Sequence, residues 1–359
     1  MIIDIVKVFL PAVGAFVLGI LITPPLTDFL YKHKMWKKKS GKIDMGGQDT
    51  PIFNELHKEK QVNTPRMGGV VVWGSVLITV SVIWLLAEFV SGPTLINLDI
   101  LSRSQTWIPL ATLIIGALVG LLDDYLVTRP SESKYEAAGI PLKKRLFVVS
   151  IIALLCALWF YLKLDVNSIG LPEALGGFIY LGAFFVPFFI LVIVAIYAGG
   201  VIDGIDGLSG GVLASIFGAY GGIAFYQQQY DLAAFCAAVV GGILAFLWFN
   251  IPPARYYMSD TGMMGLTITL GIVAFMTDRL GDGYGILVLP IIALPLVVTV
   301  LSNIIQVLSK KFRGKKVFLV APLHHHFEAI GWPAYKVTMR YWIFSLICAI
   351  LGITLALIG

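Results

Sequence analysis

Long apolar runs separated by short polar segments cover the whole chain, and this pattern predicts a helical membrane protein. There are about ten such runs, each close to the roughly 20 residues that a helix needs to cross a hydrocarbon core of ~30 Å. None alternates apolar and polar residues as a half-buried strand does, and a helix satisfies its own backbone groups in lipid. We therefore predict an all-α polytopic bundle in which none of these runs forms a strand. The predicted spans are residues 5–30, 68–91, 107–126, 145–165, 178–198, 209–227, 232–250, 262–277, 284–308 and 336–358.

The positions of lysine and arginine predict the orientation of the bundle, because these residues gather in short cytoplasmic loops. The first run carries its lysines after it, the reverse of a cleavable signal peptide, so it should stay as a span with its N-terminus outside. Those lysines are Lys32, Lys34, Lys37, Lys38 and Lys39. Alternating the spans from there puts all the strongly basic segments in the cytosol. They are residues 31–67, 127–145, 251–261 and 309–340.

Composition agrees with lipid as the main solvent. Hydrophobic residues make up 58% of the 359 positions and charged residues 13%. The net charge of +5 follows from the cytoplasmic bias of lysine and arginine, needs no nucleic-acid partner, and can also attract anionic lipid or phosphorylated substrates. The three cysteines all lie in apolar runs, and their odd number implies no disulfide framework. We expect one transmembrane domain over residues 1–359.

Two prolines interrupt the ninth run. Pro290 and Pro295 each remove a backbone donor, so they should kink or break this span. We hypothesise that the break opens a groove accessible to lipid.

Paired acids end the third run on the predicted cytoplasmic side. Asp123 and Asp124 are adjacent, and adjacent side chains on a helix point about 100° apart. One can therefore face the bundle centre while the other faces a loop or a metal bound to phosphate. Ionisable groups at membrane depth are costly and indicate function. The alternative is an ordinary helix end at the membrane interface.

Further acids lie in two other segments of the same predicted face. Asp203 and Asp206 belong to the glycine-rich segment 199–211, where close backbone approach and carboxylate oxygens suit a bound nucleotide or phosphate. A tight polar turn is the alternative. Asp260 precedes the eighth run, where capping of a helix N-terminus is the alternative to a functional role.

Three of the five histidines are consecutive, at His324, His325 and His326. Consecutive side chains on a helix cannot all face one metal, which disfavours zinc and favours binding of phosphate and sugar oxygens. Carboxylates gathered around one site repel unless a divalent cation neutralises them, and oxygen ligands select a hard ion such as Mg²⁺. At a lipid boundary, such a site suits transfer of a phosphorylated group from a soluble donor to a lipid acceptor.

These motifs resemble those of the phospho-N-acetylmuramoyl-pentapeptide transferases, within the superfamily of polyprenyl-phosphate N-acetylhexosamine-1-phosphate transferases. The resemblance extends over nearly the whole chain, and the triple histidine is its most specific part. The matching pieces are Thr64 to Gly69, Asp123 to Tyr125, Asp203 to Leu208, Trp248 to Asn250, Asp260, Gly262, Ala321 to Glu328, Gly331, Trp332 and Arg340.

The resemblance implies ten transmembrane helices in the bacterial inner membrane, with a periplasmic N-terminus and an active site at the cytoplasmic face. It implies Mg²⁺-dependent transfer of phospho-MurNAc-pentapeptide from UDP-MurNAc-pentapeptide to undecaprenyl phosphate. The products would be UMP and the first lipid-linked precursor of peptidoglycan, called lipid I. Membrane lipid and a second copy of the chain, as a homodimer, complete the expected partners.

The resemblance also implies roles for single residues. Asp260 would bind the Mg²⁺, and Asp123 and Asp124 would lie beside the attacking lipid phosphate and the diphosphate. His324 would join these three acids as a catalytic residue. The expected substrate-binding residues are Lys60, Thr64, Arg66, Asp203, Asp206, Asn250, His325 and His326.

The chain departs from the family pattern at several of these positions. Arg66 replaces a usual threonine and is common in the branch that transfers GlcNAc-1-phosphate. Val127 and Ala138 stand where the family commonly has lysines, and Gly200 and Ile202 where it has polar side chains. The candidates to replace the lysines are Lys134, Lys143 and Lys144.

Two other functions compete with this one. A transferase using UDP-GlcNAc is favoured by Arg66 and disfavoured by the triple histidine. An ion-coupled transporter would place its acids near the membrane midplane in broken helices, whereas these acids lie at span ends on one face.

Overall fold

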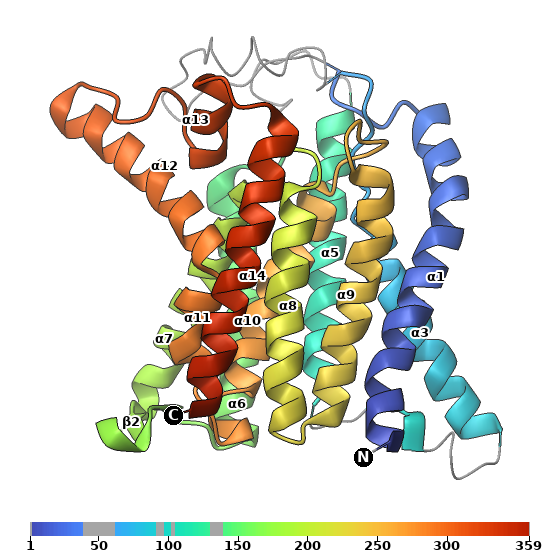
Figure 1. The fold of residues 1–359 in the computed structure, drawn as a ribbon, viewed down its shortest axis with the longest axis vertical. Coiled ribbons are helices and arrows are strands. Elements are labelled where there is room, and N and C mark those ends of the chain that lie inside the picture. Colours follow the sequence, from blue (N-terminus) through green and yellow to red (C-terminus); the bar gives the residue numbers. More distant parts are fainter. Residues whose placement is uncertain (1, 39–61, 91–96, 102–104, 130–138, 359) are drawn as a thin grey trace.

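The chain folds into an elongated helical bundle in a computed structural model (Figure 1). The structure describes residues 2–38, 62–90, 97–101, 105–129 and 139–358. Within these ranges, ten helices are long and apolar enough to cross a membrane, which confirms the predicted all-α polytopic fold. They are α1 (Ile2–Lys32), α3 (Val70–Phe89), α5 (Trp107–Thr128), α6 (Leu142–Lys163), α7 (Phe185–Ala198, extended by the 3-10 turns Gly182–Phe184 and Gly199–Ile202), α8 (Leu208–Tyr226), α9 (Tyr230–Asn250), α10 (Ser259–Met276), α12 (Leu294–Arg313) and α14 (Ala334–Ile358).

Helix α10 forms the centre of the bundle, since 94% of the residues in its apolar stretch are buried, compared with 22% in α1. It packs closely on α5 through small residues, as membrane helices often do. A Cβ added at Gly116 of α5 would lie 2.9 Å from the Cα of Gly265 in α10, and one at Gly120 would collide with the carbonyl of Asp260. The glycines therefore bring the last turn of α5 against the first turn of α10.

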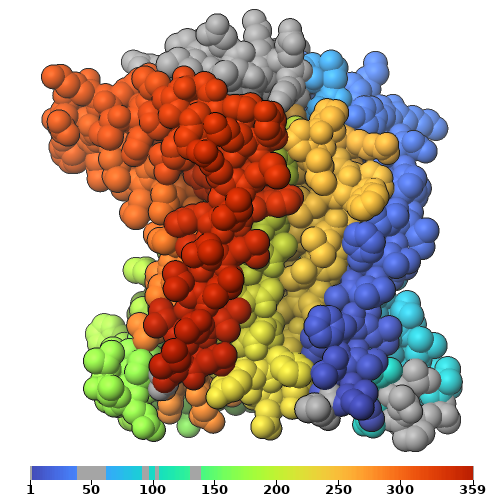
Figure 2. Space-filling view, viewed as in Figure 1, coloured from blue at the N-terminus to red at the C-terminus, as the bar shows by residue number. Residues whose placement is uncertain are grey.

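The ninth predicted span is broken, as its prolines predicted. Helix α11 (Gly285–Ile292) contains Pro290, and α12 begins directly after Ala293 with Pro295 in its first turn. Beyond this break α12 leans away from the bundle (Figure 1). Figure 2 shows the molecular outline hollowed beneath it. This shape fits the predicted groove, which stays a hypothesis.

The prediction that none of the apolar runs contains a strand was wrong at residues 178–180. Strand β2 (Phe178–Tyr180) pairs antiparallel with β1 (Ser168–Gly170), so the fifth run begins with a strand and turns helical only afterwards. The cause lies in the connection, where Gly176 and Gly177 have φ values of +101° and +76°. Glycine adopts these left-handed conformations at little cost, which allows the chain to reverse. The hairpin lies at the end of the bundle that also holds both termini (Figure 1).

A buried carboxylate fastens this hairpin to the bundle. Asp278 is 2% exposed and follows α10, next to the 3-10 turn Arg279–Gly281. Its Oδ1 accepts a hydrogen bond from the backbone N–H of Gly170 at 2.7 Å, and its Oδ2 accepts one from Ile286 at 3.0 Å. Burial raises the pKa of Asp278 to about 6, against the opposing effect of these hydrogen bonds.

We expect the stability of the protein to depend on pH through Asp278. The folded state holds the Asp278 proton more tightly than the unfolded chain, because its pKa is raised to about 6. The resulting stabilisation is complete below the ordinary pKa of about 4 and is lost as the pH rises through about 6, by roughly 2–3 kcal/mol in total. The apparent unfolding temperatures of wild type and Asp278→Asn in detergent, measured from about pH 4 to about pH 8, check this, because that range includes both the ordinary and the raised pKa. Wild type should lose stability relative to the variant as pH rises, and a constant difference would contradict the prediction.

Candidate active site

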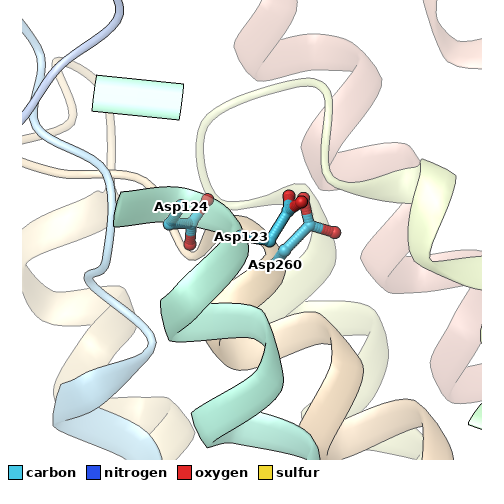
Figure 3. Close-up of side chains that lie close together, drawn as sticks. All are labelled: Asp123, Asp124 and Asp260. Carbon is cyan, nitrogen blue, oxygen red and sulfur yellow. The ribbon is translucent and has the colours of Figure 1, made fainter. Parts of the chain in front are cut away.

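Three carboxylates meet where α5 ends and α10 begins. Asp123 and Asp124 lie in the last turns of α5, and Asp260 lies in the first turn of α10. One oxygen from each lies within 4.8 Å of the others. Figure 3 shows Asp123 and Asp260 pointing toward each other, while Asp124 points to the other side. This divergence of neighbouring side chains is the one predicted from helix geometry. We call this end of the bundle the site end.

Asp124 is completely buried, and both of its oxygens are occupied by protein donors. Its Oδ1 accepts hydrogen bonds from Nε of Arg66 at 2.9 Å and forms an ion pair with Nη2 of Arg66 at 2.8 Å. Its Oδ2 accepts from the backbone N–H and the hydroxyl of Thr261, at 2.9 and 2.6 Å. Asp124 therefore satisfies a backbone donor in the first turn of α10, which has no partner within its own helix.

Arg66 lies in the segment before α3 and keeps its charge in this position. Burial lowers the pKa of Arg66, but the carboxylates of Asp124 and Asp260 outweigh it and hold that pKa above its ordinary value. The distance from Nη2 of Arg66 to Oδ2 of Asp260 is 3.8 Å. Arg66 thus links the loop before α3 to the last turns of α5 and to the first turn of α10.

Asp123 and Asp260 share a second arginine. Nη1 of Arg145, in the first turn of α6, lies 3.2 Å from Oδ2 of Asp260 and 3.6 Å from Oδ2 of Asp123. The N-cap position of α10 is Met258, and Asp260 lies in the first turn of the helix, so Asp260 is not itself the N-cap residue. Its side chain is 26% exposed, against 1% for Asp123. Tyr197, at the end of α7, lies near Arg145 and interacts with it electrostatically.

Arg145 was missed by the sequence reasoning, which looked for lysines. Of the candidate replacements, Lys143 and Lys144 are exposed in the first turn of α6, and Lys134 lies outside the described residues. The available signal was the run of three cations at the start of the fourth span. Which of the three faces the acids depends on how α6 is rotated against α5 and α10.

The donor set of the cluster fits a hard divalent cation. Asp123 and Asp260 face each other with oxygens alone, the ligands that such ions prefer. The guanidinium of Arg145 lies between them, which marks this point as favourable for positive charge. Asp123, Asp124 and Asp260 together could hold such an ion. Asp124 already accepts hydrogen bonds from Arg66 and Thr261, and Asp123 accepts one from the N–H of Ile140.

The glycine-rich turn lies against the start of α10. Asp203 accepts a hydrogen bond from the hydroxyl of Ser209 at 2.7 Å and one from the backbone N–H of Ser259 at 2.9 Å. Burial raises the pKa of Asp203, and these two hydrogen bonds oppose the rise. The predicted nucleotide-binding turn is therefore adjacent to Asp260 in space.

The histidine segment forms the short helix α13 (Leu323–Ala329), which faces the same turn. His324 and His325 are buried, and a Cβ added at Gly204 would lie 2.5 and 2.6 Å from their Nε2 atoms. Nδ1 of His325 lies 2.7 Å from Oε2 of Glu328. His326 points elsewhere, since its Nδ1 accepts a hydrogen bond from the backbone N–H of Leu319 at 3.3 Å. The structure thus brings two of the three histidines to the turn.

The other predicted substrate-binding residues mostly brace loops of the site end. Asn250 is buried, accepting from the N–H of Gly207 and donating to the carbonyl of Tyr256, both at 2.7 Å. A side-chain oxygen of Asp206 lies 3.4 Å from the N–H of Ala254.

Thr64 hydrogen-bonds the phenol of Tyr257. Lys60 lies outside the described residues. The substrate contacts predicted for all these residues stay predictions.

Comparisons with known proteins point to one family. The profile of glycosyl transferase family 4 matches residues 106–278, which include Asp123, Asp124, Asp203 and Asp260. The chain is 32% identical to a phospho-N-acetylmuramoyl-pentapeptide-transferase of Chloroflexus aurantiacus, over 99% of this chain and 91% of that one. It is 34% identical to the enzyme of that name from Ruegeria pomeroyi, over 94% and 90%. With that from Bacillus subtilis the identity is 31%, over 94% of both chains.

Proposed function

The chain belongs to the phospho-N-acetylmuramoyl-pentapeptide transferases, and from this premise we propose that it makes lipid I for peptidoglycan synthesis. It would transfer phospho-MurNAc-pentapeptide from UDP-MurNAc-pentapeptide to undecaprenyl phosphate and release UMP. The observation that carries the proposal is the facing pair of Asp123 and Asp260 around Arg145. Beside it lies the Asp203 turn, flanked by His324 and His325.

We assign the metal to Asp123 and Asp260, with Mg²⁺ as the ion. When held there by the two carboxylates, Mg²⁺ would supply positive charge that stabilises the negative charge developing during phosphoryl transfer. Asp124 would act by holding Arg66 and the start of α10 in place, rather than by binding the metal. This assignment extends the expected metal role of Asp260 to a second carboxylate.

The reaction would proceed by direct attack of the lipid phosphate. An oxygen of undecaprenyl phosphate would form a bond to the sugar-linked phosphorus of the donor, and the bond from that phosphorus to the UMP oxygen would break. Arg145 and Arg66 would balance the negative charge of the two phosphorylated substrates. The buried pair His324 and His325 would hold oxygens of the phosphosugar.

We further propose that the site end faces the cytosol and that the protein lies in the bacterial inner membrane. The end of α1, the start of α6 and the end of α12, where lysine and arginine gather, all lie at this end of the bundle, as expected for the cytoplasmic side. UDP-linked sugars are soluble and reach the site from that side. The homodimer stays a prediction.

Arg66 gives no support to UDP-GlcNAc as the donor. Its guanidinium is held by Asp124 at 2.8 Å, so its presence is explained by the packing of the site end. The choice between the two donors therefore does not rest on this residue.

The test is release of UMP by the detergent-purified protein with Mg²⁺ and undecaprenyl phosphate, comparing the two UDP-sugars. We expect release from UDP-MurNAc-pentapeptide and none from UDP-GlcNAc, and a dependence on added Mg²⁺ that a chelator removes. Release from UDP-GlcNAc alone would overturn the proposed donor. Release from neither, with protein that remains folded and monodisperse, would overturn the proposed reaction.

The broken ninth span predicts an effect on the lipid acceptor. Replacing both Pro290 and Pro295 by alanine restores two backbone donors, so α11 and α12 should tend toward one straight helix and close the groove. We expect the KM for undecaprenyl phosphate to rise several-fold while the KM for the UDP donor stays unchanged. Pro187→Ala is the matched control, because Pro187 lies in the first turn of α7, where proline is well tolerated. Unchanged acceptor kinetics in the double variant would remove the support for the groove.

A further inference from the structure

Helix α12 has its polar and apolar sides reversed relative to a helix of a soluble protein. Its buried side chains include Ser302, Gln306 and Ser309, which share one face at helical spacing. Large apolar side chains cover the opposite, exposed face. They are Leu301, Ile304, Ile305, Leu308 and Phe312. The exposed face of α12 is therefore suited to lipid, and its polar face must find partners within the protein.

Those partners are backbone groups of the segment that follows the helix. The amide of Gln306 donates to the carbonyl of Phe318 at 2.8 Å and accepts from the N–H groups of Val317 and Phe318 at 3.0 Å. The hydroxyl of Ser309 donates to the carbonyl of Lys315 at 2.9 Å. We call residues 310–319 the α12 tip. Because its backbone is fixed to α12, the α12 tip presents a defined set of side chains to its surroundings.

All the charged side chains of the α12 tip are basic. No acid occurs between Asp282 and Glu328 in the sequence, and the five lysines and arginines of this stretch all belong to the α12 tip. All five are exposed. They are Lys310, Lys311, Arg313, Lys315 and Lys316.

Large apolar side chains are interspersed with these cations. Phe312 is 75% exposed and Val317 is 49% exposed. Cations beside exposed apolar groups are typical of segments that lie at the headgroup level of an anionic membrane surface. A loop that contacts only water is not expected to expose large apolar side chains beside its cations.

The position of the α12 tip favours a lipid ligand over the soluble substrate. In Figure 1 the end of α12 lies at the outer edge of the site end, because α12 leans away from the bundle. The connection to the active site runs through the end of this segment, where α13 begins. There the N–H of Leu323 donates a hydrogen bond to the hydroxyl of Ser302 at 2.9 Å. The basic side chains thus lie at the lipid boundary, outside the Asp123 and Asp260 cluster.

We propose that the α12 tip binds the headgroups of anionic phospholipids in the leaflet at the site end. The lysines and arginines pair with lipid phosphates, while Phe312 and the apolar face of α12 contact the acyl chains. Bound lipid would then hold α12 in its leaning position. Because the segment after α12 leads into α13, the same lipid would also hold His324 and His325 in place.

The test measures lipid binding and not catalysis, so it can fail independently of the proposed function. Full-length protein in a neutral detergent is titrated into a fluorescent short-chain phosphatidylglycerol and, separately, into the matching phosphatidylcholine. The combined variant Lys311→Gln, Lys315→Gln and Lys316→Gln removes three charges of the α12 tip. The charge-matched control, Lys32→Gln, Lys34→Gln and Lys38→Gln, removes three from the end of α1, on the far side of the bundle (Figure 1).

We expect wild type to bind phosphatidylglycerol in preference to phosphatidylcholine. The variant of the α12 tip should bind phosphatidylglycerol at least about tenfold more weakly, since each Lys or Arg near an anionic surface contributes roughly fivefold. The control variant should weaken this binding clearly less than the α12 tip variant does, because its lysines lie away from the proposed binding site. Equal losses in both variants, or equal binding of the two lipids by wild type, would overturn the proposal. Displacement of phosphatidylglycerol by millimolar inorganic phosphate would assign the cations to free phosphate instead.

Discussion

Asp260→Ala should abolish UMP release, lowering kcat by on the order of 10³-fold, while the protein stays folded. The size of the loss follows because removing one group that stabilises transition-state charge costs about 10²–10³ in kcat, and this carboxylate would also hold the metal. The fold should survive because the two arginines that pair with Asp260 each have another carboxylate partner. Arg145 keeps Asp123, and Arg66 keeps Asp124.

The measurement is kcat at saturating concentrations of both substrates, together with a Mg²⁺ titration and the apparent unfolding temperature. Glu173→Ala serves as the control, since Glu173 is an exposed acid in the hairpin connection at the opposite end of the bundle. Asp260→Asn should also be inactive, because its amide keeps the volume but not the charge. Retention of more than about a tenth of wild-type kcat in Asp260→Ala would contradict the assigned role.

Asp124→Ala should destabilise the fold far more than any other change to the acid cluster. The substitution leaves the guanidinium of Arg66 without its main partner. It also leaves the buried backbone N–H of Thr261, in the first turn of α10, without a hydrogen-bond acceptor. Breaking a buried ion pair by removing one partner costs about 3–5 kcal/mol. The apparent unfolding temperature in detergent should therefore fall by roughly 5–10 °C.

A double variant separates the lost ion pair from other effects of this change. Arg66→Met removes the buried charge while keeping a long side chain, so Asp124→Ala combined with Arg66→Met should recover part of the lost stability. A coupling between the two substitutions of at least about 1 kcal/mol is expected for residues in contact. An unfolding temperature of Asp124→Ala within about 1 °C of wild type would show that the pair does not brace the site.

The sequence predicted the spans because lipid imposes the same requirement on every one of them, an apolar run of sufficient length. The prediction was wrong at residues 178–180. Phe178, Ile179 and Tyr180 are as apolar as the helix that follows them, so composition alone places them in the same span. Two glycines before them allow a hairpin that composition does not reveal. The break in the ninth span was predictable, since proline acts on its own helix.

The site was predictable in its members but not in their division of labour. Helix geometry required Asp123 and Asp124 to point in different directions. Which of them meets Arg66 depends on contacts with the loop before α3 and with α10, both distant in sequence. Arg145 escaped prediction for the same reason, because neighbouring cations on α6 are distinguished only by the rotation of the helix in the bundle.

The glycine contacts between α5 and α10 have a consequence for catalysis. At Gly116 and Gly120 the two main chains approach without intervening side chains, so the separation of Asp123 from Asp260 is set by backbone against backbone. Close main-chain contact leaves the two helices little room to shift against each other. The carboxylates are therefore preorganised. The free-energy cost of orienting these charged groups is met during folding, so it does not add to the barrier of each turnover.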